Sequence, residues 1–219
     1  MNNFSPNMIK TYQACPKKYY FQYVENINVP KSAVPFEKGK KIHALANYYL
    51  QKIKIDRIET ALTGAEHEIW ELLKQNPFYN MECVKSEFAL SIKLGYLSPE
   101  NDCASYWLGG RLDALVHSGG DYFILDYKTG SIPKNPRYDP QTMVYLLCAD
   151  RYLKDYNLLS FVYIDLKNKQ NHVIEFNSVL KTQYEQELYK ICTQITSDSL
   201  YKCNPEFCKF CEFNKICRR

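Results

Sequence analysis

The stretch that decides the fold is residues 110–128, Gly110-Arg-Leu-Asp-Ala-Leu-Val-His-Ser-Gly-Gly-Asp-Tyr-Phe-Ile-Leu-Asp-Tyr-Lys128. Its Gly119-Gly120 pair separates two apolar runs, which predicts a β-hairpin with a two-residue turn. With that turn, the residue numbers of every cross-strand pair sum to 239, so Asp113 is expected directly opposite Asp126. Opposed residues share a face of the sheet, with Cβ atoms about 4.5–5.5 Å apart. The hairpin therefore brings together two carboxylates that repel each other.

A divalent cation would remove that repulsion. Mg²⁺ is usually held by one or two carboxylates together with waters and phosphate oxygens of the substrate. Lys128 follows Asp126 by two residues and projects from the same face of the strand. An ammonium group there can stabilise developing charge or position an attacking water. Because the apolar residues 123–125 indicate a buried central strand, the hairpin predicts a metal-dependent hydrolytic site.

The sequence around the hairpin alternates between helical and strand periodicity. Ser5-Pro6 is a typical helix start, and Asp139-Pro140 is another. Helices are expected over about 6–24, 36–53, 58–72, 139–153 and 180–195, and strands over about 84–94, 106–116, 122–128, 159–166 and 173–176. This order predicts one mixed α/β domain over residues 1–219, with a central mixed sheet flanked by helices.

Composition excludes several classes of protein. Nineteen tyrosines and eleven phenylalanines among 219 residues are too much apolar surface for a disordered chain. The longest apolar run, Met143–Ala149, is far shorter than the ~20 residues of a membrane span, so no membrane partner is expected. The first residues lack the pattern of a signal peptide, which predicts a cytoplasmic, reducing location.

Charge is distributed unevenly along the chain. The formal net charge is +4, but residues 10–41 carry +5 and residues 202–219 carry +3, which leaves −4 for the remainder. If the two ends of the chain meet, their basic segments would form one surface that attracts phosphates. The charge pattern is therefore compatible with a nucleic acid as partner.

The nine cysteines also have an uneven distribution. An odd number in a reducing compartment argues against a disulfide framework and favours a metal site. Cys208, Cys211 and Cys217 supply three ligands in a C-x2-C-x5-C pattern, and either Cys203 or Cys15 could supply the fourth. Four thiolates suit zinc and an iron–sulfur cluster equally, so both remain open. The other four are expected to be small buried hydrophobes: Cys83, Cys103, Cys148 and Cys192.

Together these motifs resemble the PD-(D/E)XK nuclease superfamily. More narrowly, they resemble the RecB-type nuclease domains of repair helicase–nucleases and of CRISPR-associated RecB-like exonucleases. Five segments carry the resemblance, in chain order: Ser5–Val24 with Cys15-Pro16 inside it, Gly39-Lys-Lys-Ile-His43, Gly110-Arg-Leu-Asp113 with Ile124-Leu-Asp-Tyr-Lys-Thr-Gly130, Gln141-Thr-Met-Val-Tyr145, and Cys208-x2-Cys211-x5-Cys217. Leu112 stands where the superfamily's motif has its proline.

The resemblance implies a restriction-endonuclease-like core with an active site on the hairpin. Asp113 and Asp126 would bind Mg²⁺ or Mn²⁺, and His43 and the carbonyl of Tyr127 would complete the protein ligands. Lys128 would orient or activate the attacking water. Two further residues, Gln141 and Tyr145, would support the site or touch the DNA. Glu87, on the polar face of the first expected strand, is placed near the site.

The resemblance also implies a structural cofactor. Cys15, Cys208, Cys211 and Cys217 would hold a 4Fe–4S cluster that joins residues 1–30 to residues 200–219. Cys203 is then left over, and it is the residue to exchange for Cys15 if that thiol proves free.

The implied activity is that of a deoxyribonuclease, an exonuclease on single-stranded DNA ends. It would act in DNA repair and recombination or in CRISPR-type defence, with helicases or CRISPR adaptation proteins as partners. The alternative is a catalytically silent iron–sulfur DNA-binding or scaffold subunit. The intact set of Asp113, Asp126 and Lys128 argues against that alternative.

Overall fold

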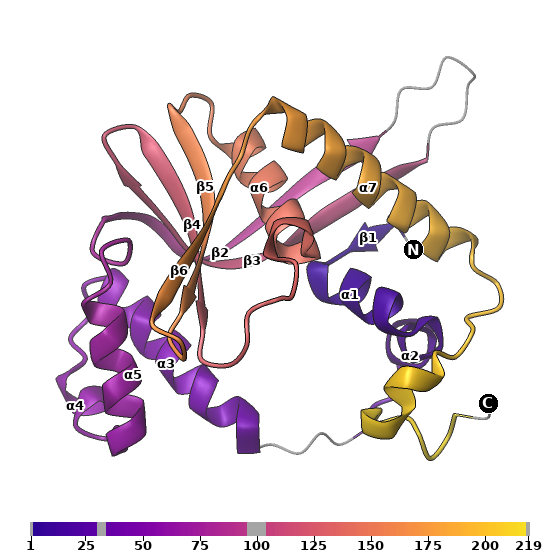
Figure 1. Cartoon of the computed structure of the whole chain (residues 1–219), viewed down its shortest axis with the longest axis horizontal. Coiled ribbons are helices and arrows are strands. Elements are labelled where there is room, and N and C mark those ends of the chain that lie inside the picture. The colour runs from indigo at the N-terminus through magenta and orange to yellow at the C-terminus, as the bar shows by residue number, and fades with distance from the viewer. Residues whose placement is uncertain (1, 30–33, 96–103, 218–219) are drawn as a thin grey trace.

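The computed structural model describes residues 2–29, 34–95 and 104–217 of the chain, so Cys103 lies outside the described residues. A mixed sheet runs through the middle of the molecule in the order β1-β3-β4-β5-β6, with β2 paired to β3 (Figure 1). Its strands are β1 (Asn3–Phe4), β2 (Glu82–Gly95), β3 (Ser105–Ser118), β4 (Asp121–Lys128), β5 (Leu158–Asp165) and β6 (Gln170–Glu175). The expected mixed central sheet is confirmed.

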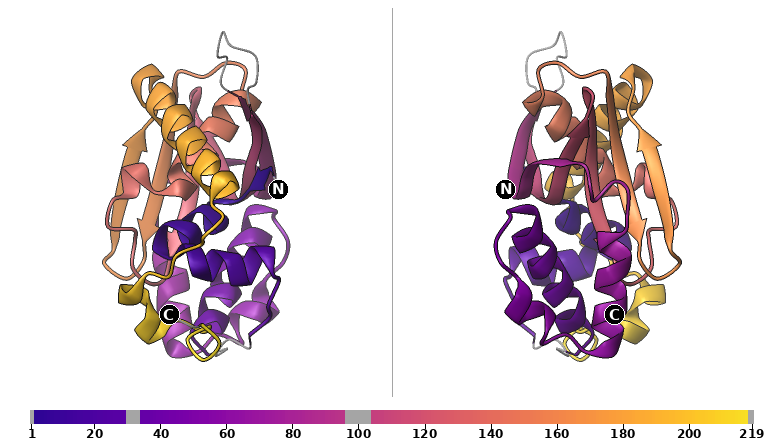
Figure 2. Two further views of the ribbon diagram at one scale, coloured as in Figure 1. Left: turned by 90° about the vertical axis from the view of Figure 1, so that its right-hand side faces the viewer. Right: turned by 90° about the vertical axis from the view of Figure 1, so that its left-hand side faces the viewer.

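Helices cover both faces of this sheet and create two apolar cores. One core joins α1 (Pro6–Ala14), α6 (Pro140–Tyr152) and α7 (Ser178–Ser197) to the sheet. The other joins α3 (Val34–Leu50) and α5 (Gly64–Lys74) to the opposite face. Figure 2 shows the N-terminal helices and the C-terminal segment gathered at one end of the molecule and the sheet at the other. Within the described ranges, no helix is both long and apolar enough to cross a membrane.

Side-chain caps explain where several helices begin. Ser5 accepts a hydrogen bond from the backbone N–H of Met8 (3.3 Å), and Asp139 accepts one from that of Gln141 (2.9 Å). Each cap satisfies an N–H that has no partner within its helix. Both starts agree with the prediction.

Two expected helices are interrupted. The helix expected over 58–72 is divided into α4 (Asp56–Glu59) and α5, because Thr63 forms a capping box with Glu66 and begins a new helix. The N-terminal helical stretch breaks at Cys15, whose backbone is extended. It resumes at Pro16 as α2 (Pro16–Tyr19) and continues in one π-helical turn, Tyr20–Val24.

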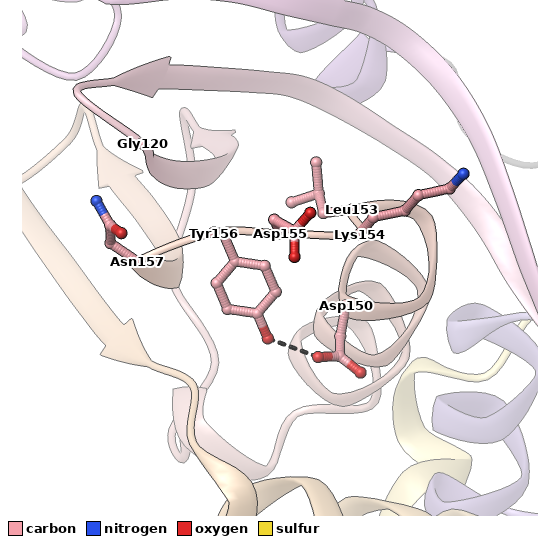
Figure 3. Close-up of a pocket in the computed structure, with 7 residues that line it drawn as sticks. All are labelled: Gly120, Asp150, Leu153, Lys154, Asp155, Tyr156 and Asn157. Atoms are coloured by element: carbon pink, nitrogen blue, oxygen red, sulfur yellow. Dashed lines mark hydrogen bonds between the residues drawn. The ribbon is translucent and has the colours of Figure 1, made fainter.

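The β3–β4 hairpin has the expected turn and register. Gly119 and Gly120 adopt φ angles of 60° and 92°, which favour glycine over other residues. Cross-strand pairs run from Ser118–Asp121 to Ala114–Leu125, and each pair sums to 239. Beside the turn is a hollow of about 500 Å³, where Tyr156 donates a hydrogen bond to Asp150 (2.5 Å) (Figure 3). The turn is thus at the opposite end of β4 from Asp126.

β3 changes neighbours along its length. β2 pairs with one edge of β3 from Ser105 to His117, so β1 and β4 share the other edge. β1 pairs with Trp107 and Leu108 and β4 pairs from Ala114 onward, which leaves residues 109–113 between them on that edge. Asp113 therefore lies where the sheet divides.

The two ends of the chain meet at a corner of the molecule. The backbone N–H of Lys17 donates to the carbonyl of Lys202 (3.3 Å), and the Lys18 ammonium pairs with Glu212 (2.9 Å). In Figure 1, α2 lies beside the C-terminal segment that contains the 3-10 helix Pro205–Phe210. The expectation that the basic ends approach each other agrees with these contacts.

Candidate active site

Asp113 links the strand β3 to the end of β4. Its Oδ2 accepts a hydrogen bond from the backbone N–H of Tyr127 (3.1 Å). The backbone ladder between the two strands ends one pair earlier, at Ala114–Leu125. The carboxylate of Asp113 thus takes the place of a backbone acceptor where the strands separate, and its other oxygen faces His43.

His43, from α3, lies between two acceptors. Its Nδ1 is 3.3 Å from Asp113 Oδ1, and its Nε2 is 3.1 Å from the carbonyl oxygen of Tyr127. Burial lowers the pKa of this imidazole, but the hydrogen bond and the charge of Asp113 raise it overall. Because both ring nitrogens face acceptors, the free site suits an imidazolium. To act as a metal ligand, His43 would have to release a proton.

Glu87 completes a cluster that could hold a metal ion. Ligand atoms of His43, Glu87 and Asp113 all lie within 4.8 Å of one another. Burial and the neighbouring charge of Asp113 raise the pKa of the Glu87 carboxyl. Glu87 also has a positive φ of 48°, a rare backbone conformation for glutamate.

The backbone irregularity at Glu87 explains how the cluster forms. β2 and β3 pair at Phe88–Leu112 and at Ser86–Ala114, but the rung between them, Glu87 with Asp113, is missing from the ladder. Residues two apart on a strand normally share a face. Here Leu112 packs in the core under α6, whereas Ala114 packs in the core under α3. The strand changes face at Asp113, and this local twist turns both carboxylates toward His43.

Asp126 forms the second half of the site, together with two residues. Its carboxylate is almost completely buried (3% exposed), and Oδ1 accepts hydrogen bonds from Lys128 Nζ (3.0 Å) and Gln141 Nε2 (2.5 Å). Oδ2 lies 2.8 Å from the same ammonium but accepts no hydrogen bond from the residues described. Burial and the charge of Asp113 raise the pKa of Asp126, although Lys128 opposes them.

Lys128 and Gln141 hold each other in place. The Lys128 ammonium also contacts Gln141 Oε1 (3.4 Å) and lies over the ring of Tyr163, 5.8 Å from its centroid. Gln141 is in the first turn of α6, where the Asp139 cap fixes its backbone. The helix start therefore positions the amide that bridges Asp126 and Lys128.

Tyr145 supports the backbone, and its hydroxyl makes no hydrogen bond to Asp113 or Asp126 in the part of the chain that the structure describes. It is one helical turn after Gln141, and its hydroxyl donates to the carbonyl of Arg111 (2.7 Å). A side chain at Gly110 would place its Cβ 2.8 Å from that hydroxyl, so glycine is needed there. Burial raises the pKa of Tyr145 well above its usual value, so the hydroxyl stays a donor.

A second cluster, the cysteine corner, consists of Cys15, Cys203, Cys208, Cys211 and Cys217. The Sγ of Cys203 lies 3.4 Å from that of Cys208 and 4.0 Å from that of Cys217. Cys15 joins the group through its Sγ, which accepts from the N–H of Asn204 (3.3 Å). The hydrogen bond with Cys208, together with burial, raises the pKa of the Cys203 thiol to about 12. Cys203, which the sequence left over, is therefore inside the corner.

Two of the other four cysteines are core residues, as expected. Cys148 and Cys192 are buried in the core beneath α6 and α7. Cys83 is only half-buried on β2, so the expectation of a buried position is met in part.

Glu87 is the one member of the metal cluster that the sequence placed only loosely. Its position depends on the register between β2 and β3, where the pairs from Lys85–Leu115 to Gly95–Ser105 sum to 200. A long connection separates these strands, so no turn signal fixes that register. The resemblance to a known motif located the other ligands without this information.

Solved structures of other proteins share this fold. No curated protein matches the chain. A solved structure from Eubacterium rectale, described as a "Putative exonuclease", has 12% identity and a TM-score of 0.57, and the match covers 100% of this chain and 90% of that one. SSO0001 has 16% identity and a TM-score of 0.50, with 99% of this chain and 86% of that chain covered. These likenesses concern the fold.

A family model gives the assignment itself. The model of the PD-(D/E)XK nuclease superfamily matches residues 3–218, which is nearly the whole chain. Nucleases of this superfamily are metal-dependent phosphodiester hydrolases. The match includes both halves of the carboxylate site and the cysteine corner. The chain therefore belongs to the PD-(D/E)XK nuclease superfamily.

Proposed function

We propose that this nuclease is a Mg²⁺- or Mn²⁺-dependent deoxyribonuclease whose active site is formed by His43, Asp113, Asp126, Tyr127 and Lys128. The observation that carries the proposal is the buried Oδ2 of Asp126, whose one partner among the described residues is the Lys128 ammonium 2.8 Å away. A buried carboxylate oxygen with a single charged partner keeps a lone pair that can bind a metal ion. Hard oxygen donors and one imidazole fit Mg²⁺ or Mn²⁺.

When bound, the metal would supply Lewis-acid polarisation of the phosphate and a more acidic water. Asp113 and Asp126 would hold it with His43 and the Tyr127 carbonyl, and Glu87 lies in one cluster with His43 and Asp113. The ammonium of Lys128 stabilises negative charge on the phosphate and orients the attacking water. Gln141 hydrogen-bonds to both Lys128 and Asp126 and fixes their relative positions. Tyr145 holds the strand that carries Asp113.

The proposed substrate is a single-stranded DNA end, which the enzyme degrades as an exonuclease. The description of the E. rectale protein supports exonuclease action. Two basic segments that meet at one corner support an anionic polymer as substrate. The whole chain is taken as one RecB-type domain in the cytoplasm, where helicases or CRISPR adaptation proteins would be its partners in repair or defence.

The cysteine corner is proposed to hold a 4Fe–4S cluster through Cys15, Cys208, Cys211 and Cys217. The approach of thiols from both ends of the chain supports a bound metal, because thiolates from separate segments are the usual ligands of zinc and of iron–sulfur clusters. The alternatives are a different ligand set and zinc. Zinc–sulfur bonds of 2.3 Å give tetrahedral edges of about 3.8 Å. The separations of 3.4 and 4.0 Å around Cys203 are close to that value, so Cys203 is the competing ligand.

One experiment tests the nuclease and the cluster separately. Protein purified without oxygen is analysed for iron and zinc and then assayed on single-stranded and duplex DNA labelled at each end. We expect iron with absorption in the visible range, and cleavage that requires Mn²⁺ or Mg²⁺ and stops with EDTA. Binding of DNA without cleavage in any metal would instead support the silent scaffold subunit. If the protein contains zinc and no iron, the corner is a zinc site instead of an iron–sulfur cluster, and the proposed nuclease activity is unaffected.

A further inference from the structure

The outer part of the β2–β3 ribbon has one covered face and one open face. Its even-numbered residues, Leu90, Ile92, Leu94, Tyr106 and Leu108, pack on the core beneath α6 and α7. The odd-numbered residues on the other side are exposed: Ala89, Ser91, Lys93, Trp107 and Arg111. Figure 2 shows these strands along one outer side of the molecule. The sheet thus presents a strip of side chains to solvent.

This strip leads to the carboxylate site. The register places Lys93 opposite Trp107, Ser91 opposite Gly109 and Ala89 opposite Arg111. Past the Phe88–Leu112 pair, the next residues toward the hairpin turn are Glu87 and Asp113, which belong to one cluster although they form no pair in the ladder. The six-residue step along β3 from Trp107 to Asp113 is about 20 Å long. A flexible chain lying on the strip would therefore reach the metal site directly.

Trp107 gives the far end of the strip an aromatic surface. Its side chain is 48% exposed, although indole rings are usually well buried. Beside it is a hollow of about 550 Å³, lined also by Asn3, Ser5, Met8 and Gly109. Gly109 admits no side chain, because a Cβ there would lie 2.5 Å from the carbonyl of Leu90. Gly109 therefore adds no side chain to the hollow beside the indole.

The charges along the strip suit an anion. Lys93 is exposed beside Trp107, and the Arg111 side chain is 66% exposed, with Nη1 3.8 Å from Glu87 Oε2. The five residues of the strip include no carboxylate, and the first carboxylates toward the hairpin turn are those of Glu87 and Asp113, which belong to the metal cluster. Two cations and one aromatic ring in a row match the phosphates and bases of an unpaired strand.

We infer that single-stranded DNA lies along this face, with one base stacked on Trp107 and phosphates beside Lys93 and Arg111. The inference rests on the proposed nuclease function and adds the path by which the strand reaches the site. Paired bases in a duplex are already stacked on their neighbours and cannot offer a free face to the indole. The strip should therefore discriminate single strands from duplexes.

Tryptophan fluorescence reports on the contact. The chain has two tryptophans, and Trp70 is completely buried, so Trp107 is the solvent-exposed emitter. In EDTA, which prevents cleavage, we expect an oligothymidylate of about twenty nucleotides to quench the tryptophan fluorescence of the protein. A duplex should quench this fluorescence less. The Trp107→Ala variant loses one stacked base, so its affinity for a labelled oligonucleotide should be roughly 5- to 150-fold lower than that of the wild type. Fluorescence anisotropy of the labelled oligonucleotide measures this affinity. Unchanged affinity in that variant would overturn the inference.

The cations are tested by salt dependence. For single strands, each lost phosphate contact should reduce the slope of log K against log salt by about 0.7. We expect this for Arg111→Gln and for Lys93→Gln. Arg151→Gln and Lys154→Gln are matched controls, because both side chains are exposed and Lys154 lines the hollow at the hairpin turn (Figure 3). If the controls lose as much affinity as the variants of the strip, charge on this face has no special role.

Measurements of catalysis distinguish the proposed DNA path from the proposed nuclease activity. With Mn²⁺, Trp107→Ala should raise KM for the oligonucleotide, keep kcat, and hydrolyse bis(p-nitrophenyl) phosphate at the wild-type rate. Equal KM values in an active wild type and Trp107→Ala would overturn the path and leave the nuclease intact. If the wild-type protein binds the oligonucleotide with quenching but cleaves neither substrate, the proposed nuclease activity is wrong, whereas the proposed DNA-binding face is still supported.

Discussion

The carboxylate site and the cysteine corner differ in how they are built. The carboxylate site lies on β2, β3 and β4 and on the helices α3 and α6, in the middle of the sheet. The cysteine corner lies on the break at Cys15, on a 3-10 helix and on turns at the chain ends. Strands buried between two cores fix side chains within narrow limits, whereas loops and short helical turns do not.

The polar contacts show the same difference. In the carboxylate site, Asp113, Asp126 and Lys128 are held by hydrogen bonds to each other's strands or to α6. In the corner, contacts between sulfur atoms predominate around Cys203. The first site is therefore preorganised by the fold, and we propose that the second depends on a bound metal for its cohesion. Four predictions can break or sharpen this distinction.

The largest effect is expected from Asp126→Asn. The amide keeps the shape of the side chain but removes a charged ligand, so Mn²⁺-dependent cleavage should fall by about 10²–10³-fold or more. Because packing is preserved, the melting temperature and the iron content should change little. Asp155→Asn, at the distant hollow, is the matched control (Figure 3). Cleavage retained by Asp126→Asn would show that the site is elsewhere.

The second prediction concerns Cys208→Ser, which should lose iron and stability but keep the carboxylate geometry. The proposed cluster would close a loop of nearly the whole chain, and a crosslink that closes such a loop contributes about 2–5 kcal/mol. At about 2–4 °C per kcal/mol for a domain of this size, the fall in Tm is easily measured by calorimetry. Cys83→Ser, on β2, is the control and should retain the metal.

The same assay applied to Cys203→Ser decides the ligand set. Full iron loading in this variant supports Cys15 as the fourth ligand. If Cys203→Ser loses iron and Cys15→Ser stays fully loaded, Cys203 is the fourth ligand instead of Cys15.

The third prediction is a moderate effect for Glu87→Gln. This change removes one carboxylate of the metal cluster but leaves Asp113 and Asp126, so the Mn²⁺ concentration for half-maximal rate should rise by about tenfold. The rate at saturating Mn²⁺ should be nearly that of the wild type. A titration of rate against Mn²⁺ measures both quantities. Identical titrations for the two proteins would exclude Glu87 from the site.

The smallest effect is expected where the corner is attached to the rest of the fold. Asp198 accepts hydrogen bonds from the Tyr12 hydroxyl (2.8 Å) and from the N–H groups of Leu200 and Tyr201 (both 2.9 Å). Burial raises the pKa of Asp198, but these hydrogen bonds lower it overall. A carboxyl with a lowered pKa in the folded state stabilises the protein above its unfolded pKa, and that stability is lost as the pH falls.

Melting curves at several pH values test this attachment. Wild type should lose slightly more stability below about pH 4 than Asp198→Asn, whose side chain cannot titrate. Asp56→Asn, at the start of α4, serves as the control and should follow the wild type. Parallel curves for wild type and Asp198→Asn would show that this carboxylate does not contribute.

The sequence predicted the sheet and the hairpin well because those signals are local. Gly119-Gly120 fixes a turn, and the turn fixes the register from Ser118–Asp121 to Ala114–Leu125, but the expected pair of Asp113 with Asp126 is not part of the ladder. The short β1 was missed, since a two-residue strand carries no periodicity. The division at Thr63 was missed as well, although Thr63 and Glu66 are a readable capping box.

The details of the site depended on packing and could not be read in advance. The change of face at Asp113 follows from the irregular rung with Glu87, which no local pattern signals. Spacing alone left Cys203 and Cys15 as alternatives, and only the fold shows both beside the C-terminal thiols. The open face with Trp107 depends on which side of the ribbon the helices cover, and that is a property of the whole molecule.

The most direct measurement is the anomalous scattering of Mn²⁺ in crystals of this protein. We expect one strong anomalous peak within bonding distance of Asp113 and of Oδ2 of Asp126, with His43 and the Tyr127 carbonyl as further ligands. The peak should disappear in crystals of Asp126→Asn grown and soaked in the same way. A peak bonded to neither aspartate, or no peak at saturating Mn²⁺ in an active wild type, would contradict the account.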